Sequence, residues 1–584
     1  MMGDADPMIG KIDKWVADGA LSRENILWRL DERIKTTLAI YLYEKRALEA
    51  VFMSACHLTD SCDGDVLSRA SFLSLLHVKG DFPRGLEGVG AGRIIYDCIS
   101  YLAMLPFPPH GQAKVDELSI VQLTRGLAWA LPDRAGYIVE ESSSSRMRTR
   151  FDHHRLLFQS LATITTPSTV QEDVRDSARA LARSSASDIP KESRDLCSLN
   201  HDDDGDEIYH DLLDILYATQ EIQHPGITPV PRDAFRAVAK QIKARAGLPD
   251  LHALAIPVPR FRTLVKALLW LQFEHEIDEN AMEVEQFEDA AQAICRAFML
   301  GQDQGTDRTA SEGFITWPSF SHALRTAAPH LFDPFYHILS LTFLGEPNPI
   351  GVLDAMEPPP VVDHVVLTQP RAGQIVSFLA HSIYTGYLKR KVRYIRPLFI
   401  SPATLIQIIS DCAKDAIVLI SGSTVTPGST KGELCIFGLF TPAPRKDRFC
   451  IQAPDAVDSL NAGQQQCMLF QLAPVQDVFR GVVGAAGWDN INVHGIQTLV
   501  FGRSGGAGDQ EGGVVLSLRN NLSRGEILHV GSGPVVEADR VGNGISYRAN
   551  PCRGDWKSGF IVQNIEVWSE VEDSRAPSAS SSDE

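Results

Sequence analysis

The side chain best placed for acid–base chemistry is Glu566, which lies among apolar residues in the segment Phe560 to Trp568. A carboxylate in apolar surroundings has a raised pKa, which suits general acid catalysis. More often, such a carboxylate is paired with a basic side chain or a backbone donor and thereby holds the register of its strand. We expect this structural role for Glu566, and we therefore expect no catalytic residue at this position.

A glycine-rich stretch, FGRSGGAGDQEGG, runs from Phe501 to Gly513 and could be taken for a phosphate-binding loop. An apolar run typical of a strand precedes it, but a second such run follows it, and no Lys-Ser/Thr pair is present. Without a helix N-terminus the loop lacks the dipole that favours a bound phosphate. The stretch is therefore interpreted as a long hairpin loop, and no cofactor is expected.

The cysteines and histidines offer little for metal binding or redox chemistry. The ten cysteines are scattered and form no C-x-x-C pair, so neither a zinc site nor a disulfide framework is indicated. Cys435 and Cys467 fall inside strand patterns, whereas a peroxidatic cysteine needs a lowered pKa and access. His153 and His154 are adjacent and point apart on a helix, and His494 has no ligand partner at metal-binding spacing. We expect a reduced, cytosolic protein without a bound metal.

One segment matches the calcium-loop signature of EF-hands, with Asp in the last position. Its members are Asn200, Asp202, Asp204, Gly205 and Asp211. No apolar helix precedes the segment, and Glu207 stands where the loop needs an apolar residue. The segment is interpreted as a solvated acidic stretch that leads into a helix at Leu212 to Tyr217.

Four other stretches keep the apolar residue at loop position eight and the apolar helix residue at position thirteen of an EF-hand. These pairs are Leu67 with Phe72, Leu118 with Leu123, Val230 with Phe235, and Ile315 with Phe320. In these registers the twelfth position, which needs a bidentate Glu, is Ser71, Gln122, Ala234 or Ser319, and the first is Asp60, Gly111, Gln223 or Arg308. The loops lack the carboxylates that calcium needs. Degenerate EF-hands and plain helix–loop–helix packing both remain open.

The elements around these residues divide into a helical half and a β-rich half. Apolar residues at helical spacing predict one long amphipathic helix from Glu24 to Phe52 and buried helices at Phe261 to Phe273 and Ala290 to Leu300. A shorter helix is expected around Arg155 to Leu161. The first half of the chain is therefore expected to be helical.

Short apolar runs separated by turn residues follow, as is typical of a β-sandwich or barrel. The runs are Ala416 to Ser421, Leu434 to Phe440, Cys467 to Leu472, Ile496 to Phe501, Gly513 to Leu518 and Phe560 to Trp568. Helical patterns at Gln374 to Ile383 and Pro402 to Lys414 stand in front of them. The fold class expected is α+β, with a helical EF-hand-like N-terminal half and a C-terminal β-sandwich with flanking helices.

Composition shifts suggest the domain boundaries. We expect helical domains at 1–164 and 207–345, an acidic, Ser-rich linker at 165–206, a Pro-rich linker at 346–362, the sandwich at 363–571 and a disordered tail at 572–584. Proline cannot continue a helix, so the main boundary is placed in the Pro-rich linker.

The charge of the chain limits the classes of partner. A net charge of −18, with 55 Lys and Arg against 73 Asp and Glu, argues against a general nucleic-acid binder. No apolar run approaches the roughly 20 residues of a membrane span, and the N-terminal MMGDADPMIGKID has no apolar core. Gly3 could carry a myristoyl group if translation began at Met2, although Pro7 stands where that motif needs Ser or Thr.

A basic cluster contrasts with the acidic average and is the candidate interaction surface. It contains Lys389, Arg390, Lys391, Arg393 and Arg396, with Tyr394 between them and Tyr387 just before them. Five cations in eight residues could bind an acidic protein surface or phosphates. A solvated helix end and linker is the alternative interpretation of the same cluster.

An ordered set of motifs in the C-terminal half resembles the TLDc domain family. The set comprises Phe437 and Gly438, Leu469 and Phe470 before Val478 and Phe479, the FGRSGG loop with Gly502, Gly505 and Gly506, the GVVLSL strand, and a closing strand with Glu566 and Trp568. The chain departs from the family in the long GAGDQEGG insert after the loop. The helical first half, the spacer and the length together resemble the fungal restriction of telomere capping protein 5 family.

This resemblance implies a cytosolic, non-enzymatic and monomeric protein that binds other proteins and no nucleic acid. TLDc proteins are associated with oxidative-stress resistance and with binding the vacuolar proton-pumping ATPase, so peripheral association with the vacuolar membrane is expected. The family name records a genetic link to telomere capping. Two alternatives stay open: an enzyme with peroxide-handling or hydrolytic activity that uses Glu566 or a cysteine, and a membrane-tethered adaptor acylated at Gly3.

Overall fold

The structure is a computed structural model of the 584-residue chain. It describes residues 7–38, 42–56, 66–80, 82, 90–108, 115–139, 150–165, 208–220, 229–247, 250–273, 284–301, 313–345, 365–379, 392–395, 401–410, 416–425, 432–441, 467–481, 488–493, 496–502, 513–519, 521–531 and 547–569.

The chain combines helices and sheet and divides into two compact units, which confirms the α+β class. The helical unit consists of residues 1–286, 302–325 and 331–352. The sheet unit consists of residues 353–584 together with two short segments from the first half, 287–301 and 326–330. The helix expected at Ala290 to Leu300 is therefore part of the sheet unit.

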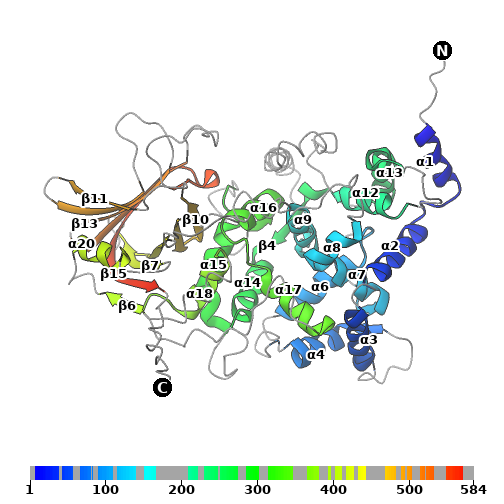
Figure 1. Ribbon diagram of the computed structural model, residues 1–584, viewed down its shortest axis with the longest axis horizontal. Coiled ribbons are helices and arrows are strands. Elements are labelled where there is room, and N and C mark those ends of the chain that lie inside the picture. The colour runs from blue at the N-terminus through cyan, green and yellow to red at the C-terminus, as the bar shows by residue number, and fades with distance from the viewer. Residues whose placement is uncertain are drawn as a thin grey trace, which may run out of the picture. The chain divides into compact units, whose positions relative to one another are not determined.

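The helical unit is built from thirteen described α-helices, shorter helical turns and five very short strands (Figure 1). The α-helices are α1 (Pro7–Ala17), α2 (Arg23–Leu38), α3 (Leu42–Cys56), α4 (Arg69–Gly80), α6 (Ala91–Ala103), α7 (Ile120–Ala130), α8 (Pro132–Val139), α9 (Arg150–Leu161), α12 (Ile208–Ala218), α13 (Arg236–Ala246), α14 (Val258–Leu271), α16 (Trp317–Thr326) and α17 (Asp333–Leu339). The shorter turns are η3 (Arg232–Phe235), η4 (Leu251–Ala253), η6 (Val284–Phe287) and the π-turn η7 (Ser340–Leu344).

The helix predicted from Glu24 to Phe52 is wrong in its length, because the structure has two helices there. In α2, Ile26, Leu30 and Ile34 recur at helical spacing and are buried. Near its end Thr36 donates its hydroxyl to the Glu32 carbonyl at 2.9 Å, a back-bond that weakens a helix. The next helix, α3, begins at Leu42.

Pairs of helix–loop–helix units in the helical unit are joined by short antiparallel strands. Strand β1 (Val66–Ser68) pairs with β2 (Glu117–Ser119), which places Leu67 opposite Leu118. Strand β4 (Leu254–Pro257) pairs with β5 (Phe314–Thr316) and with β3 (Ile164–Thr165). In each joined pair, apolar residues lie opposite each other across the two strands, and a helix follows each of β1, β2, β4 and β5.

The β4–β5 pairing adds a pair of apolar residues that the sequence analysis did not single out. The residue opposite Ile315 is Ile256, whose apolar partner five residues on is Phe261, and both are buried. Ile256 and Phe261 thus have the same spacing as the four pairs identified from the sequence, whereas Val230 lies just before the turn η3.

The sheet unit contains one large sheet and four described helical elements. Its strands are β6 (Val392–Ile395), β7 (Ala416–Thr424), β8 (Leu434–Thr441), β9 (Met468–Ala473), β10 (Asp477–Arg480), β11 (Trp488–Val493), β12 (Ile496–Phe501), β13 (Gly513–Arg519), β14 (Arg524–Val530) and β15 (Trp556–Ser569). The helices are α15 (Glu288–Ala297), α18 (Gln369–Val376), α20 (Pro402–Ser410) and the turn η10 (Pro551–Arg553).

The long closing strand β15 holds the sheet together. The strand order is β10-β9-β8-β7-β15-β14-β13-β12-β11, with β6 also paired to β15. The first half of β15 pairs with β14, and the second half pairs with β6 along one edge and with β7 along the other. The strand therefore belongs to both halves of the sheet, as a strand at the corner of a sandwich does.

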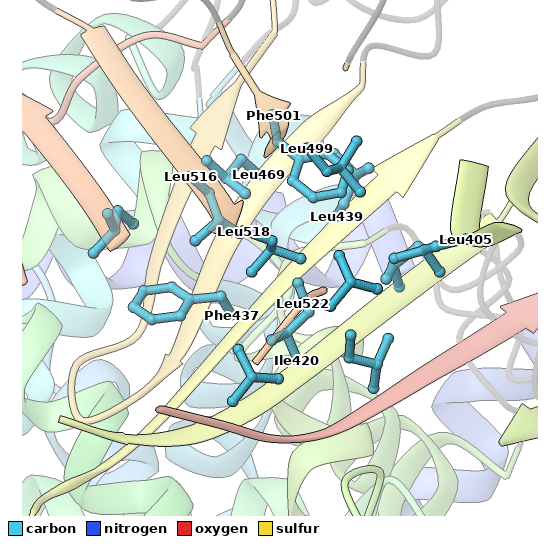
Figure 2. Close-up of a cluster of buried hydrophobic side chains, with 14 of the residues drawn as sticks. Leu405, Ile420, Phe437, Leu439, Leu469, Leu499, Phe501, Leu516, Leu518 and Leu522 are labelled. Atoms are coloured by element: carbon cyan, nitrogen blue, oxygen red, sulfur yellow. The ribbon is translucent and has the colours of Figure 1, made fainter. Parts of the chain in front are cut away.

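The two halves of the sheet enclose a shared apolar core. Figure 2 shows side chains of β7, β8 and β9, such as Ile420, Phe437 and Leu469, gathered with Leu499 and Leu516 of β12 and β13. Further members of this cluster, Leu405 and Ile409, come from α20. Alternate residues of each strand supply the core, which is the period that a sheet with one face on the core requires.

The predicted strands are all present, and four strands were not predicted. Runs of β-branched and aromatic residues located β7, β8, β9, β12, β13 and β15 to within a few residues. The strands missed as elements are β6, β10, β11 and β14. The antiparallel pairing of β12 with β13 confirms that the glycine-rich stretch lies between two strands and not before a helix.

Helices α15 and α18 cover the outer face of the sheet at β9. The predicted helix at Gln374 to Ile383 starts earlier in the structure, at Gln369, because Pro370 occupies the first turn, where its missing N–H is tolerated. Helix α18 contacts both α15 and β9. Phe378, just after α18, packs on Phe470 of β9 with ring centroids 5.0 Å apart.

Replacing Gly438 by Ala should destabilise the sheet unit by about 1–3 kcal/mol, because a Cβ there would overlap the ring of Phe470 and lie 3.0 Å from Leu419. The matched control is Gly559→Ala in β15, where a Cβ meets nothing closer than a carbonyl oxygen at 4.0 Å. Calorimetric unfolding of both variants checks the prediction, and equal stability of the two would contradict it.

Candidate functional site

Glu566 is fully buried and accepts three hydrogen bonds. Its carboxylate accepts the backbone N–H groups of Val366 and Leu367 at 2.8 and 2.9 Å. The indole N–H of Trp568, two residues further along β15, donates to the same carboxylate at 3.3 Å. The carboxylate therefore holds the segment before α18 against the sheet.

A bulge in β15 determines the direction in which Glu566 points. The register with β7 shifts between Val562 and Asn564. Before the shift, Phe560 and Val562 face the sandwich core, and after it Ile565 and Val567 do so. The extra residue moves the even-numbered positions to the outer face, because side chains alternate along a strand. Glu566 and Trp568 consequently lie on the face where α18 packs.

A basic side chain also holds the segment that binds Glu566. Arg371 of α18 donates to the carbonyl of Val365 at 3.3 Å and also to that of Val366. Burial lowers the pKa of Arg371, and the nearby charges of Glu566 and Asp289 act in the opposite direction. The segment that donates its N–H groups to Glu566 is thus held through its carbonyls as well.

Two buried glutamines connect α18 and α15 to the sheet at β9. The side-chain amide of Gln374 donates to the Leu472 carbonyl at 3.0 Å and to Gln476 at 3.2 Å. Gln476 donates in turn to the Ala327 carbonyl and to the Ser377 hydroxyl, both at 2.9 Å. Its backbone N–H donates to the Ala293 carbonyl of α15 at 3.0 Å. Buried polar groups that are satisfied in this way specify one packing arrangement.

The other motif residues serve the packing of the sheet. Phe437 is buried and its ring lies 5.1 Å from that of Phe560. Gly502 has a φ of +90°, and a Cβ there would lie 2.5 Å from the Val514 carbonyl oxygen, so a side chain is excluded on two grounds. Gly505 and Gly506 lie outside the described residues.

The basic cluster is described at one position. The backbone of Arg393 is in β6, opposite Val567 of β15. Lys389, Arg390, Lys391 and Arg396 lie outside the described residues. The structure thus gives the cluster a strand at its centre, where the sequence suggested a helix end and linker.

A second polar cluster was missed by the sequence reasoning. Asp477 is buried, accepts the Asn550 side-chain amide at 3.0 Å and pairs with Arg553 at 3.2 Å. His529 accepts the Asn550 backbone N–H at Nε2 and donates from Nδ1 to the Gly554 carbonyl, at 2.9 and 2.8 Å. Burial lowers the pKa of His529, which agrees with a neutral ring. The residues come from three separate segments, so no local sequence motif could predict the cluster.

The described cysteines with perturbed pKa values are poor nucleophiles. Burial raises the pKa of the Cys98 thiol to about 11 and that of the Cys435 thiol to about 12. The pKa of Cys467 is raised for the same reason. The thiolate is the reactive form, so these three side chains react slowly near neutral pH.

Helix capping occupies the positions that calcium would use in the helical unit. Gln122, at a twelfth position, exchanges two hydrogen bonds with Ser119 at 2.9 and 3.3 Å and so caps α7. Ser71 donates its backbone N–H to the Ser68 hydroxyl at 3.1 Å, at the start of α4. Within the described ranges, no group of three or more His, Cys, Asp or Glu residues could hold a metal.

Asp211, the last residue of the segment that matches the calcium-loop signature, forms an ion pair with an arginine. Asp211 is buried in α12 and accepts the Arg155 guanidinium at 2.9 Å, and Arg155 also pairs with Asp152 at 2.9 Å. Asn200, Asp202, Asp204 and Gly205 lie outside the described residues, as does His494. His153 of α9 lies 3.0 Å from the Tyr336 hydroxyl and has no metal-binding partner among the described residues.

Comparison with known proteins gives one distant relative. No family model matches the chain. The protein named Restriction of telomere capping protein 5 from Coccidioides posadasii (strain C735) is 25% identical over 267 residues, covering 39% of this chain and 39% of that protein. The chain therefore matches well under two thirds of the relative's length, and the similarity supports a distant relationship. No helix in the described parts of the chain is long and apolar enough to cross a membrane.

Replacing Glu566 by Gln should destabilise the sheet unit by about 2–4 kcal/mol, because the new NH₂ group would face at least one of three N–H donors and leave it unpaired. The control is Glu433→Gln, whose carboxylate is exposed and lies 3.4 Å from Arg296; it should cost less than about 0.5 kcal/mol. Calorimetry measures both, and a similar loss for the two variants would refute the anchoring role.

Calcium should leave the unfolding temperature unchanged, because Ser71, Gln122 and Ser319 replace the bidentate Glu. A site occupied at 100 times its Kd would add about 2.7 kcal/mol of stability, which is easily measured. Thermal unfolding in millimolar calcium and in a calcium chelator makes the comparison. A rise of several degrees with calcium would show that a site had been overlooked.

Proposed function

We propose that this chain is a non-enzymatic interaction protein of the TLDc type that binds the vacuolar proton-pumping ATPase and affects its assembly. The observation that supports this proposal best is the use of Glu566. The one carboxylate that sequence reasoning singled out for acid–base chemistry is fully buried and accepts three N–H groups. A carboxylate held in this way stabilises an architecture and is out of reach of a substrate.

The state of the cysteines favours binding over peroxide chemistry. Burial raises the pKa of Cys98, Cys435 and Cys467, whereas a peroxidatic cysteine needs a lowered pKa. We therefore assign the family's link with oxidative-stress resistance to regulation of a partner. The chain is proposed to act in the cytoplasm and to reach the vacuolar membrane through that partner.

The helical unit fits a role as a rigid second binding lobe. We interpret its paired helix–loop–helix units, with Leu67 opposite Leu118 and Ile256 opposite Ile315, as degenerate EF-hands. Caps such as Ser119 on α7 hold the helices where calcium would otherwise act. A lobe that needs no ion would present its surface at any calcium concentration. The relative's name adds a distant, family-level link with telomere capping.

Affinity purification of the tagged full chain from its own cells tests the proposal. Subunits of the proton pump should co-purify, and replacing Lys389, Arg390, Lys391, Arg393 and Arg396 by Gln should reduce their recovery, because an acidic partner surface would lose its counter-charges. The full chain is used because residues 287–301 belong to the sheet unit.

The matched control replaces Lys45 and Arg46 of α3, which are exposed, by Gln. Recovery should then equal that of the unmodified chain. Normal recovery of pump subunits with the variant that lacks all five basic residues would show that the basic cluster is not part of the interface. Failure to recover any pump subunit, together with ester or peroxide turnover by the purified chain, would refute the proposed function.

A further inference from the structure

Two arginines face each other across neighbouring strands at one end of the sheet. Gly481, just after β10, forms an antiparallel bridge with Tyr547. The Arg548 backbone N–H donates to the Arg480 carbonyl at 3.0 Å. This register places Arg480 directly opposite Arg548, with Cβ atoms roughly 5 Å apart as in any such pair.

Both side chains project from the outer face of the sheet. Their neighbours Phe479 and Tyr547 belong to the sandwich core. Because side chains alternate along a strand, Arg480 and Arg548 point to the opposite face. Arg480 is partly buried there and Arg548 is exposed.

Neither guanidinium has an ion-pair or hydrogen-bond partner among the described residues. Burial lowers the pKa of Arg480, but an arginine keeps its charge at neutral pH. Two like charges directly opposite each other destabilise a sheet, and a partly buried charge needs a counter-charge. Among the described residues the pair therefore has no counter-charge, and an anion bound there would stabilise it.

The same sheet contains a second pair of opposed arginines, which has a carboxylate beside it. Arg519 of β13 lies opposite Arg524 of β14, and Glu526 lies 3.6 Å from Arg519 and 3.1 Å from Lys557. Nearby, Arg553 pairs with Asp477 and stacks on Trp556 at 4.1 Å from its ring centroid. Arg519 and Arg553 thus have a carboxylate within the fold, which the Arg480–Arg548 pair lacks among the described residues.

The end of β15 lies at the same end of the sheet as this pair. The strand registers align Ser569 with Ala416 and Thr441, and they continue through Cys467 and Gly481 to Tyr547. Five strand spacings of about 4.8 Å put Ser569 roughly 24 Å from Tyr547 along the sheet.

The residues that follow β15 are acidic. Residues 570–584, EVEDSRAPSASSSDE, carry five Asp or Glu side chains against one Arg. At about 3.3 Å per residue an extended segment of this length spans roughly 50 Å, about twice the distance to the arginine pair. Its charge and its reach therefore both suit the arginine pair.

We propose that the Arg480–Arg548 pair binds the acidic C-terminal segment, residues 570–584, of the same chain. The segment supplies the counter-charge that the pair lacks among the described residues. Because it is tethered, its effective concentration at the pair is in the millimolar range, so an acidic partner must compete with it. This inference does not depend on the identity of the partner.

A labelled peptide of residues 570–584 tests the inference by fluorescence anisotropy. One receptor is the full chain, and the other is the full chain with Glu570→Gln, Glu572→Gln, Asp573→Asn, Asp583→Asn and Glu584→Gln. The neutralised chain should bind the peptide at least about tenfold more tightly, because its own segment no longer competes. Adding Arg480→Gln and Arg548→Gln to that chain should reduce binding at least about tenfold.

The control pair is Arg519→Gln with Arg524→Gln, which should leave binding unchanged because the Glu526 carboxylate beside Arg519 repels an acidic peptide. If the Arg480 variant does not fold, Arg548→Gln alone should still weaken binding, since this side chain is exposed. Unchanged binding without the two arginines, equal loss in the control, or equal binding of a scrambled peptide would overturn the proposal. Sedimentation showing a dimer that the neutralised chain does not form would instead assign the site to a second copy.

Discussion

The hydrogen bonds from Val366 and Leu367 to Glu566 are the interaction on which the sheet unit depends. They join the chain that enters the unit to the strand that completes it, across about 200 residues of sequence. The carboxylate can accept them because the bulge between Val562 and Asn564 turns it to the outer face. Since three N–H groups surround it, the charge is stabilised without a full ion pair, which is how a buried carboxylate is tolerated. The helices on that face, α15 and α18, pack around the segment that these bonds fix.

The helical unit also contains buried charges, and there oppositely charged side chains stabilise them. Its buried charges occur as arginine–carboxylate pairs between helices, such as Arg155 with Asp211 and Arg125 with Asp31, the latter joined by two bonds of 2.9 and 2.8 Å. Removing one partner of such a pair leaves a buried charge, which costs more than the pair contributes. The start of α7 is fixed by the Ser119 cap. Both units therefore place hydrogen-bonded polar groups beside apolar packing.

Sequence reasoning predicted the strands whose runs are mostly apolar and rich in β-branched and aromatic residues, because such runs favour a buried sheet. It missed β14, whose RGEILHV sequence alternates and carries charges, and β11, whose WDNINV sequence contains three polar residues. Ile256 and Phe261 were not singled out, although they have the same spacing as Val230 and Phe235, and only the pairing with Ile315 identifies them. The structural role of Glu566 could be expected from its apolar neighbours. Its hydrogen-bond partners could not be predicted, because Val366 and Leu367 donate through their backbone N–H groups, which every residue type except proline has.

The inclusion of α15 in the sheet unit has a consequence for biosynthesis. The helix ends at Ala297, and the strand on which it packs, β9, begins at Met468, so 171 residues separate them. At about 5–20 residues per second, a ribosome needs on the order of 10–30 s to make that interval. During this time the apolar side of α15, including Ala290 and Ile294, has been made but its sheet has not. The first half of the chain therefore emerges with a helix that cannot reach its final place until much later, and chaperones have a defined surface to protect in the meantime.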